Sequence, residues 1–276
     1  MGSVTVLEKS EVLSGLFGSW DSIDQLLSGL SEQQWQTPTP LPGWCVHNVV
    51  AHMIGTESSL QGLGAPDADI DLSSLDHVRN DVGAMNEAWV RHLAPETGAV
   101  LLQRFRSITG ERRNVLTAMS VDDWNAPTPT PVGLESLGRF MRVRLFDCWM
   151  HEHDIRDGVG LPSPIAELEG PAARLSLDEI AATMGYVVGK LGKAPEGSRV
   201  VIELTGPLAR TIRVAVDGRA RVVDDFGGRE PTTTIRLDGL LLARLAGGRT
   251  DDTTGIELGG DTEAGARIVD HLNFVI

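Results

Sequence analysis

Three side chains from two distant stretches of the chain have the types and spacing of a metal-binding set. Asp147 and His151 lie four residues apart within the segment Leu145–Arg156, and His52 lies far upstream. In a helix, residues at i and i+4 share one face, so this carboxylate and this imidazole can bind the same ion. Two histidines and one carboxylate leave coordination positions open for water or a substrate, which is typical of a catalytic site. The sequence therefore predicts a metalloenzyme, provided that the three side chains meet.

Each member of this set also has a simpler structural interpretation. A lone histidine such as His52 on an amphipathic helix is more often a hydrogen-bonded core or surface residue than a ligand. Asp147 and His151 on a helix surface would stabilise that helix by only about 0.2–0.5 kcal/mol. The pair lies within the apolar stretch Leu145–Met150, however, which argues against an exposed surface. Taken together, the three residues favour the metal site.

Two neighbours of the set have expected supporting roles. Asp154 lies three residues after His151 and is expected to orient that imidazole. A salt bridge from Asp154 to Arg156 or Arg113 is the alternative. Trp44 is expected to pack where a loop enters the second predicted helix, with a place in the wall of the site as the alternative.

The composition is that of an ordinary globular protein. The 276 residues are 41% hydrophobic and 22% charged, and the mean hydropathy is −0.04, so one large domain or two smaller ones can bury a core. The formal net charge of −14 disfavours nucleic acid and anionic membranes as partners. The N-terminus lacks the features of a signal peptide and no apolar run is long enough to span a bilayer, so we expect a cytoplasmic protein.

The two cysteines, Cys45 and Cys148, cannot form a disulfide framework. Cys148 directly follows Asp147, so its side chain is turned by about 100° from the metal-facing stripe of the helix. We therefore expect Cys148 to be a small buried hydrophobic residue.

The elements that must position these residues are helical up to about residue 194. Apolar residues recur at three- and four-residue steps, and proline- and glycine-rich loops over 37–43 and 125–133 separate the stripes. The segment 62–75 is expected to be a mobile loop, and the fourth helix to be interrupted near Gly110. The fifth helix carries Asp147 and His151 and is expected to end at Gly158 and Gly160. Helices are predicted over 12–30, 46–60, 75–92, 97–119, 134–157 and 170–191.

After residue 194 the apolar period becomes two, which is typical of strands. Asp217-Gly218 between two alternating runs predicts a hairpin. We expect a small α+β domain over 195–276, with helices on one face of its sheet, after a helical domain over 1–194. The boundary is expected within Lys193–Ser198. Strands are predicted over 199–204, 211–216, 219–223, 232–237 and 256–258, and helices over 237–245 and 262–272.

These motifs resemble those of a known family. Pro42-Gly-Trp44, Val46–His52 and Asp147–His151 with Asp154 three residues on are similar to the mycothiol-dependent maleylpyruvate isomerase family of the DinB-like superfamily. The resemblance spans nearly the whole chain. It implies an N-terminal DinB-like up-down four-helix bundle and a small sterol-carrier-like α+β domain after it.

The resemblance also implies a ligand set. A divalent metal would be held by His52, Asp147 and His151, with zinc as the first choice and nickel, iron or manganese as alternatives. The better-known isomerases of this family carry glutamate where this chain has Asp147, which is one methylene shorter. The metal identity and affinity of this chain are therefore less determined than its ligands.

The activity implied by the resemblance depends on mycothiol, a low-molecular-weight thiol. Its sulfur would bind the metal as a thiolate and add to a small electrophilic or carboxylate substrate, which makes the enzyme an isomerase or an S-transferase. Arg249 is the residue that the resemblance suggests for binding a substrate carboxylate, and Arg142 and Arg144 are alternatives. In most acidic proteins, however, an arginine such as Arg249 only pairs with neighbouring carboxylates.

Two other classes of function remain open. The first is a metal-dependent hydrolase or transferase that does not use mycothiol. The second is a non-enzymatic protein that binds a metal or small ligand, and a lipid-sized apolar cavity in the second domain would favour a carrier. Phosphate-binding loops, dinucleotide fingerprints and serine-nucleophile elbows are all absent from the sequence. The sequence does not indicate the substrate or the oligomeric state.

Overall fold

The computed structural model describes residues 4–67, 75, 78, 80–130 and 133–274. It forms two compact units, Met1–Ser163 and Pro164–Ile276. Among the residues described, no helix combines the length and apolar character that a membrane span requires.

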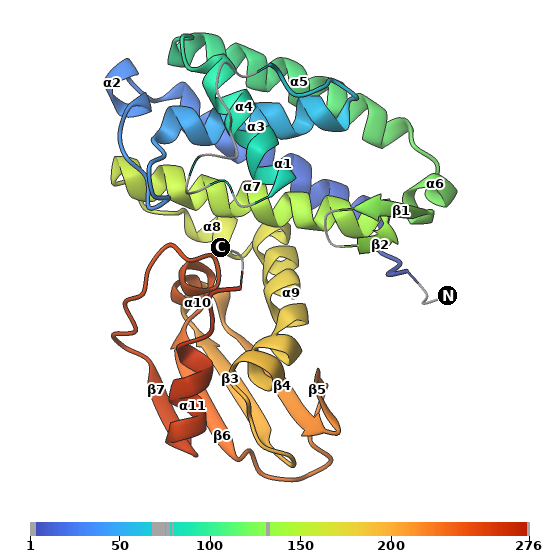
Figure 1. Ribbon diagram of the computed structural model, residues 1–276, viewed down its shortest axis with the longest axis vertical. Coiled ribbons are helices and arrows are strands. Elements are labelled where there is room, and N and C mark those ends of the chain that lie inside the picture. The colour runs from blue at the N-terminus through green and yellow to red at the C-terminus, as the bar shows by residue number, and fades with distance from the viewer. Residues whose placement is uncertain (1–3, 68–74, 76–77, 79, 131–132, 275–276) are drawn as a thin grey trace. The chain divides into compact units, whose positions relative to one another are not determined.

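The first unit is mainly helical, and its helices pack against one another, as Figure 1 shows. The first and third helices of the chain, α1 and α3, each pack against α5 and α7, while α4 packs against α3. Large side chains such as Trp20 and Phe105 are fully buried between them. The helices of this unit are α1 (Lys9–Ser28), α2 (Glu32–Trp35), α3 (Val46–Leu60), α4 (Asp81–Leu93), α5 (Gly98–Ala118), α6 (Val121–Asn125) and α7 (Leu137–Val159).

Local signals explain where α7 begins and ends. The Ser136 hydroxyl accepts a hydrogen bond from the backbone N–H of Arg139, which satisfies a donor of the first turn. Gly160 ends the helix in the left-handed conformation with φ of 71°. The predicted end at Gly160 is therefore confirmed, whereas Gly158 lies within the helix.

Two other helices differ from the prediction. Helix α5 continues through Gly110, because Ile108 and Arg112 on either side are buried in the bundle and their packing outweighs the weak helix propensity of one glycine. Helix α4 begins at Asp81 and not at residue 75, since the Asn80 side chain caps it by accepting from the N–H of Gly83. Of the loop predicted over 62–75, residues 68–74 lie outside the described part.

The predicted loop over 125–133 was wrong in part, because it contains a strand. Strands β1 (Pro127–Thr130) and β2 (Gly133–Ser136) pair antiparallel, with Pro127 opposite Ser136. A proline removes a hydrogen-bond donor, but a two-stranded ribbon has an outer edge on which no partner strand needs that donor. The prolines that suggested a loop are therefore compatible with a strand here.

The second unit contains a five-stranded sheet in the order β5-β4-β3-β6-β7. All neighbouring pairs are antiparallel except β3 and β6. The Asp217-Gly218 hairpin is confirmed between β4 and β5, with Gly218 at a φ of 65°. The strands are β3 (Arg199–Thr205), β4 (Arg210–Asp217), β5 (Arg219–Val222), β6 (Thr233–Asp238) and β7 (Glu257–Gly260).

Helices cover one face of this sheet, as predicted. Alternate residues of β3, β4 and β6 are buried on that face, while Glu203 and Arg236 on the opposite face are exposed. The helices of this unit are α8 (Ile165–Leu168), α9 (Pro171–Tyr186), α10 (Gly239–Ala246) and α11 (Thr262–Val269), and a short π-helical turn, Val187–Leu191, extends α9.

The boundary between the units differs from the predicted one. Helix α9 lies within Pro164–Ile276, so the boundary follows Ser163 and does not fall within Lys193–Ser198.

Small residues explain why this helix packs on the sheet. A Cβ on Gly185 of α9 would lie 3.2 Å from the carbonyl oxygen of Ala220 in β5, and a Cβ on Gly189, in the π-helical turn that extends α9, would lie 2.5 Å from the Cβ of Ala220, so glycine permits this close approach.

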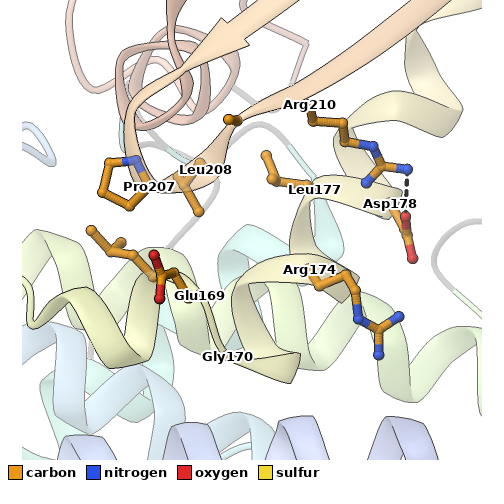
Figure 2. A pocket seen from close by; sticks show the side chains of 10 residues that line it. Glu169, Gly170, Arg174, Leu177, Asp178, Pro207, Leu208 and Arg210 are labelled. Atoms are coloured by element: carbon orange, nitrogen blue, oxygen red, sulfur yellow. Dashed lines mark ion pairs between the residues drawn. The ribbon is translucent and has the colours of Figure 1, made fainter.

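Hollows in the second unit have charged as well as apolar linings. Figure 2 shows a cavity of about 420 Å³ in which Arg210 and Asp178 form an ion pair at 2.6 Å beside Leu177 and Leu208. Two further hollows, of about 610 and 410 Å³, are also partly lined by charged side chains. These linings do not have the apolar character that would favour a lipid carrier.

Candidate metal centre

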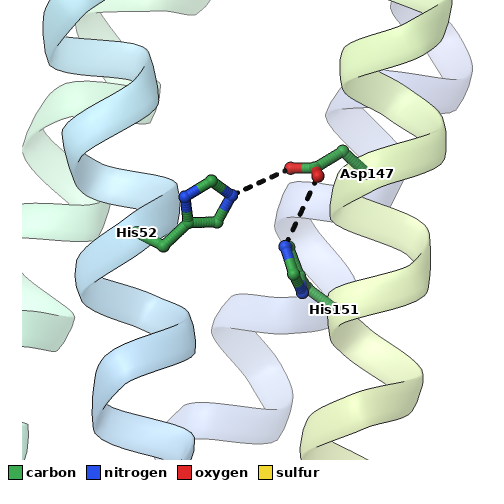
Figure 3. Close-up of side chains that lie close together, drawn as sticks. All are labelled: His52, Asp147 and His151. Carbon is green, nitrogen blue, oxygen red and sulfur yellow. Dashed lines mark hydrogen bonds and ion pairs between the residues drawn. The ribbon is translucent and has the colours of Figure 1, made fainter. Parts of the chain in front are cut away.

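Helices α3 and α7 bring His52, Asp147 and His151 together, as Figure 3 shows. The Nε2 atom of His52 lies 3.4 Å from Oδ2 of Asp147, and the Nε2 atom of His151 lies 3.4 Å from Oδ1 of the same carboxylate. One ligand atom from each residue can be chosen so that all lie within 4.8 Å of one another. The predicted convergence of these three side chains is confirmed.

The separations fit a divalent cation between the donors. Zinc bonds to nitrogen and oxygen are about 2.0–2.2 Å long, so neighbouring ligand atoms in a tetrahedral site are about 3.4 Å apart. A strong hydrogen bond between nitrogen and oxygen is shorter, at about 2.9 Å. Both imidazoles thus stand at ligand spacing from Asp147. Their two nitrogens and one oxygen are a donor set that suits zinc and other first-row metals.

The site is enclosed on one side and open on the other. The residues His52 and His151 are 6% and 5% exposed, whereas the Asp147 side chain is 32% exposed. The Trp44 ring lies against both imidazoles, with ring centroids 5.4 Å from His52 and 6.5 Å from His151. Trp44 therefore lies in the wall of the site, and solvent or a ligand can approach beside Asp147.

A carboxylate fixes the orientation of one imidazole. Oδ2 of Asp154, which is 1% exposed, lies 2.9 Å from Nδ1 of His151. A carboxylate at this place keeps a proton on Nδ1 and orients Nε2 toward Asp147. The expected contact between Asp154 and His151 is confirmed. Arg156 pairs with Glu152 and Arg113 pairs with Asp21.

The electrostatics of the three residues differ because their neighbours differ. Burial lowers the pKa of His52, whose Nδ1 atom has no hydrogen-bond partner among the described residues. Burial opposes the charged form of His151 too, but Asp147 and Asp154 raise the pKa of His151 to about 9. Burial likewise opposes ionisation of Asp147, yet His151 and Arg144 hold the pKa of that carboxyl well below its usual range. In the metal-free protein, His151 carries a proton that a cation would displace.

Three further charged residues form a series of ion pairs that ends at the carboxylate ligand, and two of them were not predicted. Arg144, which was considered for substrate binding, donates to Oδ2 of Asp147 and to Glu57, and Glu57 also accepts from Arg112. A sequence signal was available for both missed residues. Arg112 continues the apolar stripe that includes Phe105 on α5, and Glu57 continues the corresponding stripe of α3.

The other predicted residues lie as follows. Arg249 belongs to the second unit, where it is half-buried and donates to the carbonyl of Gly247, and its substrate-binding role stays a prediction. Cys148 is fully buried, and burial raises the pKa of its thiol to about 12, so the expected role as a small hydrophobic residue is confirmed. Cys45 is half-buried at the start of α3, and its Sγ atom lies 2.9 Å from Oδ1 of Asn48.

Comparison with known proteins covers both units. The family described as Mycothiol maleylpyruvate isomerase N-terminal domain matches residues 16–156, and the MDMPI C-terminal domain matches residues 174–267. The second match begins within α9, in agreement with the division of the structure. Two curated proteins from strains of Mycobacterium tuberculosis, both described as uncharacterized, are each 25% identical over 191 residues, which are 69% of this chain and 71% of theirs.

Two solved structures share the fold. The crystal structure of the mycothiol-dependent maleylpyruvate isomerase matches with a TM-score of 0.61 and 17% identity, over 94% of this chain and 96% of that one. A mutant of that isomerase, with a histidine replaced by alanine, matches over the same shares with a TM-score of 0.59 and 17% identity. The match to the N-terminal domain of the family covers residues 16–156, which is more than half of this chain. This chain therefore belongs to the mycothiol maleylpyruvate isomerase family.

Proposed function

We propose that this chain is a divalent-metal-dependent enzyme that uses mycothiol as its nucleophile, and that it acts as an isomerase or an S-transferase. The observation that carries the proposal is the arrangement of His52, Asp147 and His151 at ligand spacing in a site that is open beside Asp147. Membership of the family supports the choice of thiol, since a solved structure that shares the fold is named as a mycothiol-dependent isomerase.

The side chains of the site would have different roles: metal ligands, orientation of a ligand, and exclusion of water. A bound divalent cation would lower the pKa of a thiol and so keep it as a nucleophilic thiolate at neutral pH. His52 and His151 supply neutral Nε2 donors, and Asp154 holds the proton on the other nitrogen of His151. Trp44 covers the two imidazoles and limits the access of water from its side.

Isomerisation follows from addition and elimination of the thiol. The sulfur adds to one carbon of an activated double bond, the resulting single bond rotates, and loss of the thiol restores the double bond in the other geometry. If the adduct is instead protonated and released, the reaction is a conjugation. Both outcomes use the same nucleophile, so the metal site alone does not choose between them.

Several finer features belong to this proposal. We propose zinc as the metal, a carboxylate-bearing electrophile as the substrate, a cytoplasmic location, a DinB-like bundle and a sterol-carrier-like second unit. Arg249 is proposed to bind the substrate carboxylate. An Arg249→Ala variant is expected to raise KM for a carboxylate substrate while it retains the metal, and an unchanged KM would remove Arg249 from the site.

Elemental analysis combined with thiol assays tests the proposal. Purified wild-type protein is expected to hold about one metal ion per chain, His151→Ala to lose it, and the exposed control His92→Ala to retain it. Turnover of maleylpyruvate-like substrates should require mycothiol. Full metal content in His151→Ala would contradict the ligand assignment. Equal turnover without any thiol would instead favour the metal-dependent hydrolase.

A further inference from the structure

Four charged side chains form a connected chain that ends at the carboxylate ligand. Arg112, Glu57 and Arg144 are only 4%, 1% and 4% exposed, and they alternate in sign from Arg112 to Asp147. Burial of charge costs several kcal/mol per ion unless each charge is paired. Removal of one member would therefore leave a buried charge without its partner. The last member, Asp147, is a metal ligand in the proposed function.

Hydrogen bonds fix the orientation of Arg144. Its Nε and one terminal nitrogen donate to Oε1 of Glu57 at 3.1 and 3.0 Å. The other oxygen of Glu57 accepts from Nε of Arg112 at 2.9 Å, so both oxygens of this carboxylate are used. The remaining terminal nitrogen of Arg144 donates to Oδ2 of Asp147. Arg144 is thus held between two carboxylates, with two of its nitrogens on Glu57 and the third on the ligand Asp147.

Two consequences follow for a cation bound by the three ligands. Oδ2 of Asp147 accepts from Arg144 and lies 3.4 Å from Nε2 of His52, whereas Oδ1 takes no hydrogen bond from Arg144 and lies 3.4 Å from Nε2 of His151, so Oδ1 is the oxygen with more free capacity for the cation. The formal charges of Arg112, Glu57, Arg144 and Asp147 add to zero, neutral imidazoles add none, and Asp154 beside His151 adds one negative charge. The charge of a bound divalent cation would then be only partly neutralised by its ligands and their ion-pair partners, and an anion would be attracted to the open position.

We propose that Arg144, fixed by Glu57, is a positioning residue that occupies one oxygen of Asp147 and makes the occupied site select anionic over neutral ligands. This inference rests on the proposed metal site. It adds to that proposal a charge-based reason for preferring a thiolate or a carboxylate at the open position.

Titration of the Co²⁺-loaded protein with azide, an anion, and with imidazole, a neutral ligand, tests the inference through the visible absorption of the metal. Arg144→Met removes a positive charge next to the ligand and is expected to weaken azide binding by about tenfold or more. Glu57→Gln removes a negative charge and is expected to strengthen azide binding. Imidazole affinity should change much less in both variants.

The opposite signs of these two shifts separate a charge effect from damage to the fold. Loss of structure would weaken both probes in both variants. Arg156→Met is a matched control, because it also removes a buried arginine from α7. Arg156 forms an ion pair with Glu152, which is not a proposed metal ligand. Azide affinity should remain near the wild-type value in that control.

Each remaining outcome has a defined meaning. Azide shifts of less than about twofold in both variants, with Co²⁺ still bound, would overturn the role of Arg144. Wild-type protein that binds no Co²⁺ would overturn the proposed metal site instead. If Arg144→Met does not fold, Arg144→Lys should keep azide affinity because it keeps the charge, while Glu57→Gln still tests the predicted sign.

Discussion

The pKa of His151 predicts how metal affinity depends on pH. The carboxylates of Asp147 and Asp154 raise this pKa to about 9, although burial opposes the charged form. A metal ligand must be neutral, so binding displaces a proton from His151 at any pH below that value. Burial lowers the pKa of His52, and that imidazole is already neutral at pH 7. One proton is therefore expected to be released for each cation bound.

The size of the effect follows from the same value. At pH 7 a group with a pKa of about 9 is neutral in about one molecule in a hundred, which weakens metal binding by about 2.7 kcal/mol. The apparent affinity should rise by about tenfold per pH unit from pH 7 upward and level off near pH 9. The sign is fixed because lower pH protonates the ligand and higher pH frees it.

Competition with a chelator of known pH dependence would measure this slope. Calorimetry in two buffers of different ionisation enthalpy would count the protons released. His92→Ala serves as the control, since its histidine is exposed and lies outside the ligand set. A metal affinity that stays constant between pH 7 and 9, with no proton released, would refute the assigned protonation of His151.

Three further predictions concern the support of the site and the packing of each unit. Asp154→Asn should lower metal affinity by about 10- to 100-fold without loss of helix content, measured by metal titration and circular dichroism, and wild-type affinity would contradict its orienting role. Leu101→Ala empties a fully buried position and should lower the free energy of unfolding in urea by about 2–5 kcal/mol, whereas a loss below about 1 kcal/mol would contradict the packing. Gly189→Ala should destabilise the protein, because the added Cβ would meet Ala220. Gly110→Ala is the control: its added Cβ would enter open space, so it should stabilise α5 by up to about 1 kcal/mol. Equal shifts of the two variants in thermal unfolding would show that the close approach to Ala220 is absent.

Local chemistry made much of the first unit readable from the sequence. Apolar spacing predicted α3 over the same residues that the structure shows, and the i and i+4 rule placed Asp147 and His151 on one face of α7. The Asp217-Gly218 pair predicted a hairpin because a tight turn needs a residue with positive φ. Each of these features depends on residues that are close in sequence.

Other features depended on partners that are distant in sequence. The prolines of β1 suggested a loop, and only pairing with β2 made the segment a strand. The stripe of α9 showed that the helix is amphipathic, but not whether it faces other helices or a sheet. Its close approach to Ala220 in the second unit decided that question.

The candidate metal site divides in the same way. The sequence by itself determined the ligand types, the helix that carries Asp147 and His151, and the resemblance to the family. Only the tertiary structure decided that His52 faces them, that Asp147 is partly exposed, and that Glu57 and Arg112 lie behind Arg144. The physical reason is that helical periodicity defines which face a residue occupies, whereas the distances between charges on different helices are set by how those helices pack.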